Sequence, residues 1–351
     1  MNFLTLKNNL GSPKNTVQSK KIIQSILLFF IANFYLINAH ACCGYEEDEI
    51  DEVEESYRGF YSLPTHRKAS NDLDTCFVKL DVKSRPGSKS YPKINPDVYK
   101  DGKITKGYEA LSMRHMHVGA KIGHDDRVHV PHTEKSPWRV HGHLEMLFPN
   151  GVWYIGSGTM VNYKHVLTAG HCLYSEKDGG WATSIKFTAA QNGREMPIEP
   201  AFATHLLTVK GWKEGRDSRF DMGMLILDRD LGEETGWYGL STDTDKFLES
   251  LKVNVTGYPG DKDKGSGTQM WTMSGAIAKI YPEQFTYTLD TTGGQSGSGV
   301  YAQFTKPVGY YCVGIHTQGR ENKYNTATRI TSSKFDRLVS WINGIWYDFK
   351  P

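Results

Sequence analysis

Residues 166–172 read VLTAGHC, a short apolar strand followed by a small-residue turn that carries His171. A histidine at a strand end can reach into a cleft, and its ordinary pKa of about 6.5 lets it take up and return a proton near neutral pH. Because an isolated histidine is more often structural, the interpretation of His171 as a general base depends on the residues that accompany it.

Short apolar and aromatic runs continue around this stretch from about residue 120 onward, and glycine-containing turns separate them. The clearest strand predictions are residues 153–155, 159–161, 166–168, 224–227 and 253–255. Near the end of the chain, Phe335, Leu338, Val339 and Ile342 fall at helical spacing after TSS at 331–333, whose hydroxyls can cap a helix. With 35 glycines and 12% aromatic residues, the composition favours an all-β body with a C-terminal helix.

A carboxylate stands directly before one of these strands, in RFDMGMLIL at residues 219–227. The strand is apolar on both faces, so Asp221 is expected to be partly buried, and a buried charge needs a partner such as a histidine N–H. A lone aspartate in a turn would be ordinary, but this one is a candidate to orient His171.

Glycines surround a serine in TTGGQSGSG, residues 291–299. A nucleophilic serine needs an exposed hydroxyl on a tight turn, and an oxyanion hole needs converging backbone N–H groups without obstructing Cβ atoms. Ser296 fits the first role, and the N–H groups of Gly294 and Ser296 fit the second. A Gly/Ser loop alone is a weak signal, but the order base, acid, nucleophile is that of the chymotrypsin arrangement.

At these motifs the chain resembles the glutamyl endopeptidase branch of the chymotrypsin-like serine proteases, over about residues 122–342. The resemblance includes IGHDDR at 122–127, VTGYPGDK at 255–262 with MW at 270–271, GIHT at 314–317 and TRIT at 328–331. It implies a double six-stranded β-barrel with a C-terminal helix, and His171, Asp221 and Ser296 as a catalytic triad.

The resemblance also implies how the substrate side chain before the scissile bond is bound. In that family a histidine and a threonine contact the substrate glutamate, which carries over to His316 and Thr291. An imidazole and a hydroxyl can together hold one carboxylate. The family's free α-amino group also contributes, so a cut near Gly119 and Ala120 would be needed to expose it.

Two residues depart from the family pattern. Gly299 stands where the family commonly has proline. Asp290 lies six residues before Ser296, the offset of the aspartate that binds lysine or arginine in trypsin-like enzymes. Specificity for Lys or Arg through Asp290 is therefore an alternative to glutamate.

The N-terminal third predicts export and processing. Lys20 and Lys21 precede an apolar run over 22–37 and then AHA at 39–41, the order of a signal peptide, and the run is short for a membrane anchor. An acidic stretch at 46–56 and a polar segment to about residue 106 should bury little apolar area. We expect a signal peptide over 1–41, a propeptide over 42–119 and the protease domain over 120–351, in a secreted protein.

Charge and composition limit the other function classes. The 41 basic and 39 acidic residues leave a net charge of +2, so nothing calls for nucleic acid or a membrane as partner. Seven histidines between 115 and 143 match no standard zinc spacing, and the five cysteines lack it too. We expect a monomer without metal or cofactor that acts on proteins or peptides and is activated by another protease. The rival of another class is a catalytically silent binding protein on the same fold.

Overall fold

The structure is a computed structural model that describes residues 71–80, 108–110, 119–320 and 323–346. The chain divides into residues 1–63 and 64–351, and every described residue belongs to the second unit. The expected signal peptide and the acidic stretch at 46–56 lie outside the described residues. Within the described ranges, no helix has the length and apolar character needed to cross a membrane.

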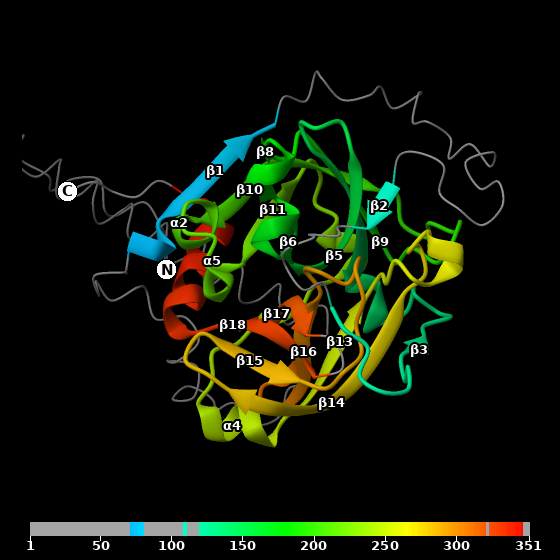
Figure 1. Cartoon of the computed structure of the whole chain (residues 1–351), viewed down its shortest axis with the longest axis vertical. Helices are drawn as coiled ribbons and strands as arrows, with labels where there is room; N and C mark the ends of the chain where they lie inside the picture. Colours follow the sequence, from blue (N-terminus) through cyan, green and yellow to red (C-terminus); the bar gives the residue numbers. More distant parts are fainter. Residues whose placement is uncertain (1–70, 81–107, 111–118, 321–322, 347–351) are drawn as a thin grey trace, which may run out of the picture. The chain divides into compact units, whose positions relative to one another are not determined.

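Six antiparallel strands form a first closed barrel (Figure 1). The order around it is β10, β11, β6, β5, β4 and β9, and β9 pairs back with β10 through Phe187 and Ala201. The bounds are β4 (His141–Leu147), β5 (Trp153–Asn162), β6 (His165–Thr168), β9 (Ser184–Ala189), β10 (Ala201–Val209) and β11 (Gly223–Leu227). The strands predicted at 153–155, 159–161, 166–168 and 224–227 are all present here.

A second closed barrel follows along the chain in the order β17, β16, β13, β14, β15 and β18, closed by pairing of β17 with β18. Its strands are β13 (Lys252–Gly257), β14 (Trp271–Ile280), β15 (Gln284–Tyr287), β16 (Gly299–Thr305), β17 (Val308–Arg320) and β18 (Tyr324–Arg329). Helix α5 (Ser332–Ile342) comes next, and its N-cap Thr331 accepts a hydrogen bond from Lys334 N. The predicted double barrel with a C-terminal helix is therefore confirmed.

Short elements join and extend the barrels. Strands β3 (Val128–His129) and β12 (Gly239–Leu240) extend the second barrel, and β7 (Tyr174–Ser175) and β8 (Gly180–Trp181) form a separate hairpin. The helices are α2 (Lys210–Lys213), α3 (Gly232–Thr235) and α4 (Asp245–Ser250), with 3-10 turns η2 (Asn71–Leu73), η5 (Trp138–Val140), η6 (Gly170–Cys172), η7 (Glu176–Asp178), η8 (Ser218–Phe220) and η9 (Asp263–Gly265).

Two strands come from the segment that the sequence assigns to the propeptide. β1 (Thr75–Lys79) pairs antiparallel with β10 over five residues, and β2 (Tyr108–Ala110) pairs parallel with β5. Thr75 Oγ1 accepts hydrogen bonds from Arg337 and from the Trp341 indole, both on α5. Leu73, just before β1, is 4% exposed and joins the apolar core. Residues 71–80 therefore bury more than their polar composition suggests.

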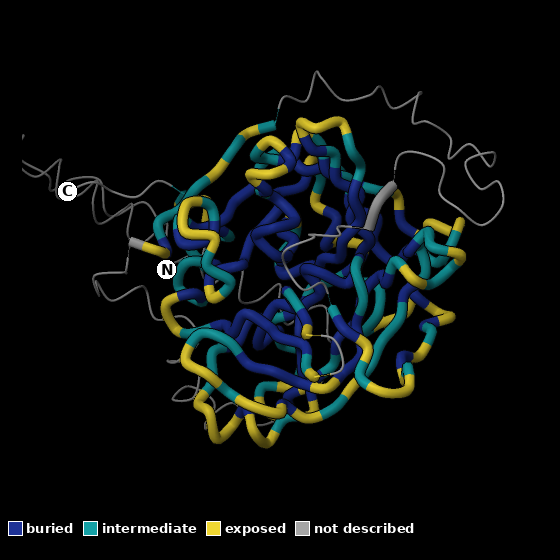
Figure 2. Tube along the Cα trace, in the orientation of Figure 1, coloured by how far each residue is buried: buried dark blue, intermediate teal, exposed yellow. Residues whose placement is uncertain are grey.

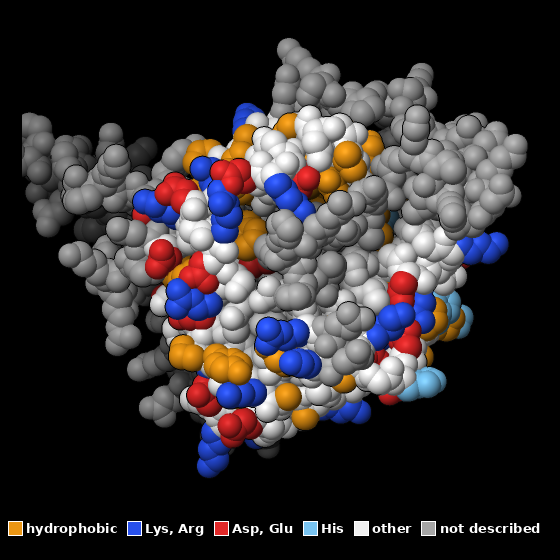
Figure 3. Space-filling model, viewed as in Figure 1, with side chains coloured by type: hydrophobic (Ala, Val, Ile, Leu, Met, Phe, Trp, Pro, Cys, Tyr) orange, Lys and Arg blue, Asp and Glu red, His pale blue; other side chains and the backbone are white. Residues whose placement is uncertain are grey.

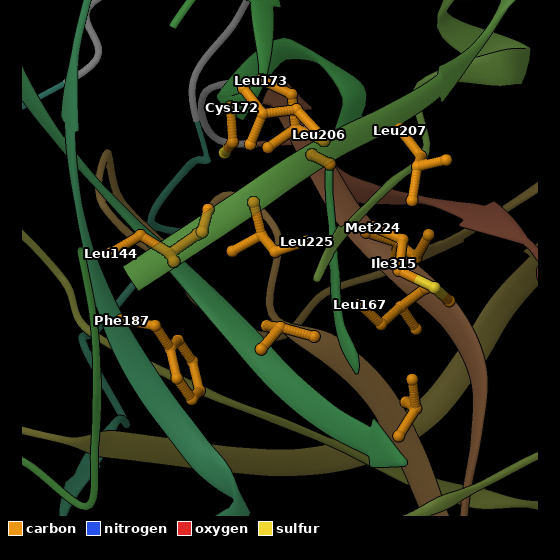
Figure 4. Packing of buried hydrophobic residues seen from close by; sticks show 14 of the residues in the cluster. Leu144, Leu167, Cys172, Leu173, Phe187, Leu206, Leu207, Met224, Leu225 and Ile315 are labelled. Atoms are coloured by element: carbon orange, nitrogen blue, oxygen red, sulfur yellow. The ribbon is translucent and has the colours of Figure 1, made fainter. Parts of the chain in front are cut away.

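The larger cluster of buried apolar side chains fills the first barrel and extends to Tyr301 and Ile315 of the second barrel and to Trp341 of α5. A smaller cluster fills the second barrel, and the buried backbone in Figure 2 follows both barrels. All five residues of β11 are buried, in agreement with its apolar sequence. Figure 4 shows side chains from several strands packed together, among them Leu144, Leu167, Leu206 and Leu225. Each such side chain stabilises the fold by about 1.5–3 kcal/mol. On the face in Figure 3, Lys and Arg are interspersed with Asp and Glu.

Candidate active site

Neighbouring strands bring His171 and Asp221 together. His171 lies in η6, directly after β6, and Asp221 precedes β11, which pairs with β6 so that Gly223 faces Thr168. The Nδ1 atom of His171 is 2.7 Å from Asp221 Oδ2, and the His171 N–H donates to Oδ1 at 2.9 Å. Both side chains are buried. The structure thus pairs the predicted base with the predicted orienting carboxylate, and both carboxylate oxygens are engaged.

The protonation of His171 is set by two opposing effects. Burial alone would lower its pKa, but the charge and hydrogen bond of Asp221 outweigh burial, so the pKa of His171 is raised well above its ordinary value. With Nδ1 held by Asp221, Nε2 is the nitrogen left to exchange a proton with another group.

The turn that carries Ser296 lies against the first barrel. Ser296 O accepts hydrogen bonds from Ser157 N at 2.8 Å and from the Cys172 thiol at 3.7 Å. Gly297 has φ +88°, and a Cβ atom there would collide with Ser157 O and Thr168 Oγ1. Only glycine fits this approach. The turn therefore places Ser296, from the second barrel, beside the residue that follows His171 in the first.

Two backbone donors of the Ser296 turn, in residues 294–296, are unengaged among the described residues. Gly294 has φ +98°, its carbonyl accepts from Ser157 Oγ at 2.8 Å, and the Gly293 carbonyl accepts from Gly260 N at 2.7 Å. Within the described part of the chain, the N–H groups of Gly294 and Ser296 have no hydrogen-bond acceptor. Two unengaged N–H groups near a serine are what an oxyanion hole requires.

His316 and Thr291 offer two further unpaired polar atoms. His316 Nε2 and Thr291 Oγ1 are buried without a hydrogen-bond partner among the described residues. A methyl group placed on Gly119 would overlap Thr291 Oγ1 and would lie 3.0 Å from His316 Nε2, so the two atoms flank one point. Buried polar atoms are seldom left unpaired, so this pair is suited to a polar group of a ligand.

A tyrosine that the sequence reasoning missed holds the other side of His316. The Tyr287 hydroxyl is 2.6 Å from His316 Nδ1, and both side chains are fully buried. Burial, together with the charge of His171, lowers the pKa of His316 to about 3. His316 is thus neutral at pH 7. If Nδ1 accepts from Tyr287, the ring proton is on Nε2 and is available to donate.

Asp290 accepts hydrogen bonds from the backbone of the segment that starts the expected protease domain. Its Oδ1 accepts from Ile122 N at 2.6 Å and its Oδ2 from Asp126 N at 3.0 Å, and the side chain is buried. Asn325, also missed from sequence, clasps Ala120 through hydrogen bonds of 2.7 Å to both its N and O atoms. Both carboxylate oxygens of Asp290 therefore have structural partners.

Comparison with known families decides the classification. A model of the family described as Trypsin matches residues 128–342. This chain belongs to the trypsin family. It is accordingly a serine endopeptidase by family, and its two closed barrels agree with that assignment.

Relatives of this trypsin-family chain include proteins of Bacillus and Staphylococcus species. It is 36% identical over 229 residues to a glutamyl endopeptidase of Bacillus licheniformis, covering 63% of this chain and 69% of the relative. It is 37% identical over 223 residues to a Bacillus subtilis protein named extracellular metalloprotease, with the same shares covered. A solved structure of a Glu endopeptidase in complex with MPD has a TM-score of 0.55 and 25% identity, covering 64% of this chain and 98% of that one.

The name of the Bacillus subtilis relative raises the question of metal ligands in this trypsin-family chain. Among the residues that the structure describes, no three or more His, Cys, Asp or Glu side chains gather as a metal site would need. Of the seven histidines singled out from sequence, His115 and His117 lie outside the described residues. The other five are dispersed: His124 and His132 contact nearby carboxylates, His129 packs on Trp271, and His141 and His143 are buried in β4.

Proposed function

We propose that this chain is a secreted glutamyl endopeptidase with His171, Asp221 and Ser296 as its catalytic triad. One arrangement carries the proposal: the buried His171–Asp221 pair lies beside the Ser296 turn, where the Gly294 and Ser296 N–H groups are unengaged. Family membership supports the reaction class, and the geometry supports the roles of these residues.

In the proposed mechanism, Ser296 Oγ attacks the scissile carbonyl while His171 Nε2 takes the hydroxyl proton. Asp221 holds Nδ1–H, which fixes the tautomer and stabilises the imidazolium that forms. The N–H groups of Gly294 and Ser296 bind the oxyanion. His171 then returns the proton to the leaving amine, and a water molecule hydrolyses the acyl-enzyme through the same base.

Glutamate specificity is supported by the two orphaned donors. A substrate carboxylate between Thr291 Oγ1–H and His316 Nε2–H would satisfy both buried atoms, which otherwise cost about 1–3 kcal/mol each. The alternative, Lys or Arg bound by Asp290, has less support because Asp290 already accepts two backbone N–H groups.

Processing and export are part of the proposal. Gly119 stands against both donors, so a cut between Gly119 and Ala120 would clear the carboxylate site and create a new α-amino group there. N-terminal sequencing of the protein from culture medium should give Ala120. A protease-domain fragment that begins at a residue other than Ala120 would contradict this boundary, whether or not a leader fragment accompanies it.

Three peptides that differ only at the residue before the scissile bond test activity and specificity together. We expect the trimmed protein to cut the Glu peptide, to cut the isosteric Gln peptide about 10–100-fold less efficiently, and to leave the Arg peptide intact. Ser296→Ala should lower kcat by about 10⁶-fold. Preferred cutting after Arg would support Asp290 as the residue that binds the substrate side chain. If no peptide is cut in a serine-dependent way, the alternative of a catalytically silent binding protein is favoured.

A further inference from the structure

Arg127 lies just before β3, against the second barrel, and its charged guanidinium is fully buried. Asp125 accepts from Nε at 2.9 Å and from Nη2 at 2.8 Å. Asp261 accepts from Nη2 at 2.7 Å and from Nη1 at 3.1 Å. A buried arginine without partners would be strongly destabilising, and here two carboxylates compensate its charge and accept from its N–H groups.

The contacts with Arg127 lower the pKa of both carboxylates. The hydrogen bond from Arg127 is the main cause of a pKa of Asp125 well below its usual range. Burial would raise the pKa of Asp261, but hydrogen bonds from Arg127 and Thr292 lower it to about 2. Lys262 Nζ completes the cluster with a 2.8 Å contact to Asp125 Oδ2. Both carboxylates therefore stay ionised throughout the neutral range.

The same guanidinium reaches the turn that carries the proposed nucleophile. Arg127 Nη1 donates to Gln295 Oε1 at 3.0 Å and to Thr292 Oγ1 at 2.9 Å. Gln295 Oε1 also accepts from Thr292 N at 3.0 Å, and Gln295 N donates to Thr292 O at 3.1 Å. Arg127 thus grips the two residues that bracket Gly293 and Gly294.

Those two residues define the oxyanion turn. Gln295 directly precedes Ser296, and Gly294, with φ +98°, lies between the two anchors. Glycines leave a turn free to change conformation unless side chains fix it. Backbone dipoles assist a reaction only when they are already oriented toward the developing charge. A clamp on Thr292 and Gln295 is therefore well placed to keep the Gly294 and Ser296 N–H groups aimed at one point.

We propose that Arg127 is a positioning residue for catalysis, which holds the oxyanion turn through Gln295 and Thr292. The inference rests on the proposed function. It also links activity to the segment that begins near Ala120, because Asp125 and Arg127 belong to that segment while Asp261, Thr292 and Gln295 belong to the second barrel. Correct seating of residues 120–127 becomes a condition for a formed oxyanion hole.

The test compares Arg127→Met and Arg127→Lys with a buried arginine that serves no site. Arg329 is the matched control: it ends β18 of the second barrel, it is buried, and its guanidinium donates to Asp245 at 2.6 Å and to the Asp243 carbonyl at 2.7 Å. All variants are made in the full chain, trimmed as the wild type is, and assayed with the Glu peptide beside Ser296→Ala.

We expect Arg127→Met to lower kcat about 100-fold with KM changed less than threefold, as loss of an oriented oxyanion donor would. Arg127→Lys should keep one contact and lower kcat about tenfold. Arg329→Met should reduce thermal stability but leave kcat within twofold. Gln295→Met should reproduce the kcat loss, and the double variant Arg127→Met with Gln295→Met should lose little more than either single one.

The contrary outcomes are also distinct. If Arg127→Met lowers only the melting temperature, or raises KM at constant kcat, the residue is structural and the proposal fails. If that variant does not fold, Arg127→Lys and Gln295→Met decide: wild-type kcat in both overturns the proposal. A wild-type protein without serine-dependent hydrolysis overturns the proposed function itself, and the proposal for Arg127 with it.

Discussion

His171 and His316 are both buried, yet the structure gives them opposite protonation behaviour. His171 has a carboxylate at 2.7 Å, and its pKa is raised above the ordinary value. His316 has a tyrosine hydroxyl at 2.6 Å, and burial with the nearby His171 lowers its pKa to about 3. Burial is common to both, so the partner determines which histidine can exchange a proton and which stays a neutral donor.

The largest effect is expected for Asp221→Asn, which removes the carboxylate that raises the pKa of His171. In Asp221→Asn the imidazole of His171 stays buried but loses its carboxylate, so its pKa should fall below 6.5, as that of His316 does. The amide also favours the wrong tautomer, and kcat should drop about 10⁴-fold. Wild-type kcat/KM should rise with pH as His171 loses its proton, with a midpoint above 6.5, and the variant's residual activity should have a lower midpoint.

Asp217→Asn is the matched control for that substitution. Asp217 caps η8 four residues before Asp221, its carboxylate is partly exposed, and asparagine can also cap. Its kcat should stay within twofold. Equal rates for Asp221→Asn and the wild type would mean that Asp221 does not support the base.

The second effect acts on the neutral histidine. His316→Leu should lower kcat/KM about 100-fold for the Glu peptide and by much less for the Gln peptide, because a charged acceptor gains more from the Nε2–H donor. His165→Leu removes another buried histidine, whose pKa burial lowers to about 4, and should leave the Glu/Gln ratio unchanged. An unchanged ratio in His316→Leu would place the carboxylate site elsewhere.

His141 is a third buried histidine, and its pKa affects the stability of the fold. Burial alone lowers the pKa of His141 to about 3. Below pH 6.5 the unfolded chain therefore binds a proton that the folded chain does not, and His141 should remove about 2 kcal/mol of unfolding free energy between pH 6.5 and pH 5. The raised pKa of His171 acts in the opposite sense: its contribution is full below pH 6.5 and is lost as pH rises through the folded-state value.

Urea unfolding at pH 7 and pH 5 measures this effect, in a Ser296→Ala background that prevents self-digestion. His141→Gln should lose less stability on acidification than its parent. His132→Gln, at an exposed histidine, should lose as much as the parent. Parallel losses in all three proteins would show that His141 does not couple folding to protons.

The smallest effect concerns the partner of His316. Tyr287→Phe deletes the hydroxyl at Nδ1 and should lower kcat/KM for the Glu peptide about fivefold, the value of one ordinary hydrogen bond. Tyr301→Phe removes a buried hydroxyl that contacts Thr256 in the same barrel and should leave the Glu/Gln ratio intact. An equal decline for Glu and Gln peptides would assign Tyr287 a structural role only.

The sequence predicted individual strands and the C-terminal helix through their periodicity, and its resemblance to a known family implied the double barrel and the roles of His171 and Asp221. It did not predict Tyr287, Asn325 or Arg127. Their contacts join segments far apart in sequence: Asn325 holds Ala120, and Arg127 holds Gln295. Asp290 shows that an offset in sequence can also mislead. Its position relative to Ser296 suggested a specificity residue, but its carboxylate oxygens accept hydrogen bonds from the backbone of Ile122 and Asp126.

The pairing of β1 with β10 would keep part of the leader bound to the protease domain after the chain is cut. Five residues in register, the buried Leu73 and the contacts of Thr75 with α5 all lie upstream of Ala120. A cut in the backbone between Gly119 and Ala120 would remove none of them. Such a product should run as two bands on a denaturing gel and as one peak in gel filtration, a nicked enzyme that carries part of its own leader as a fitted strand.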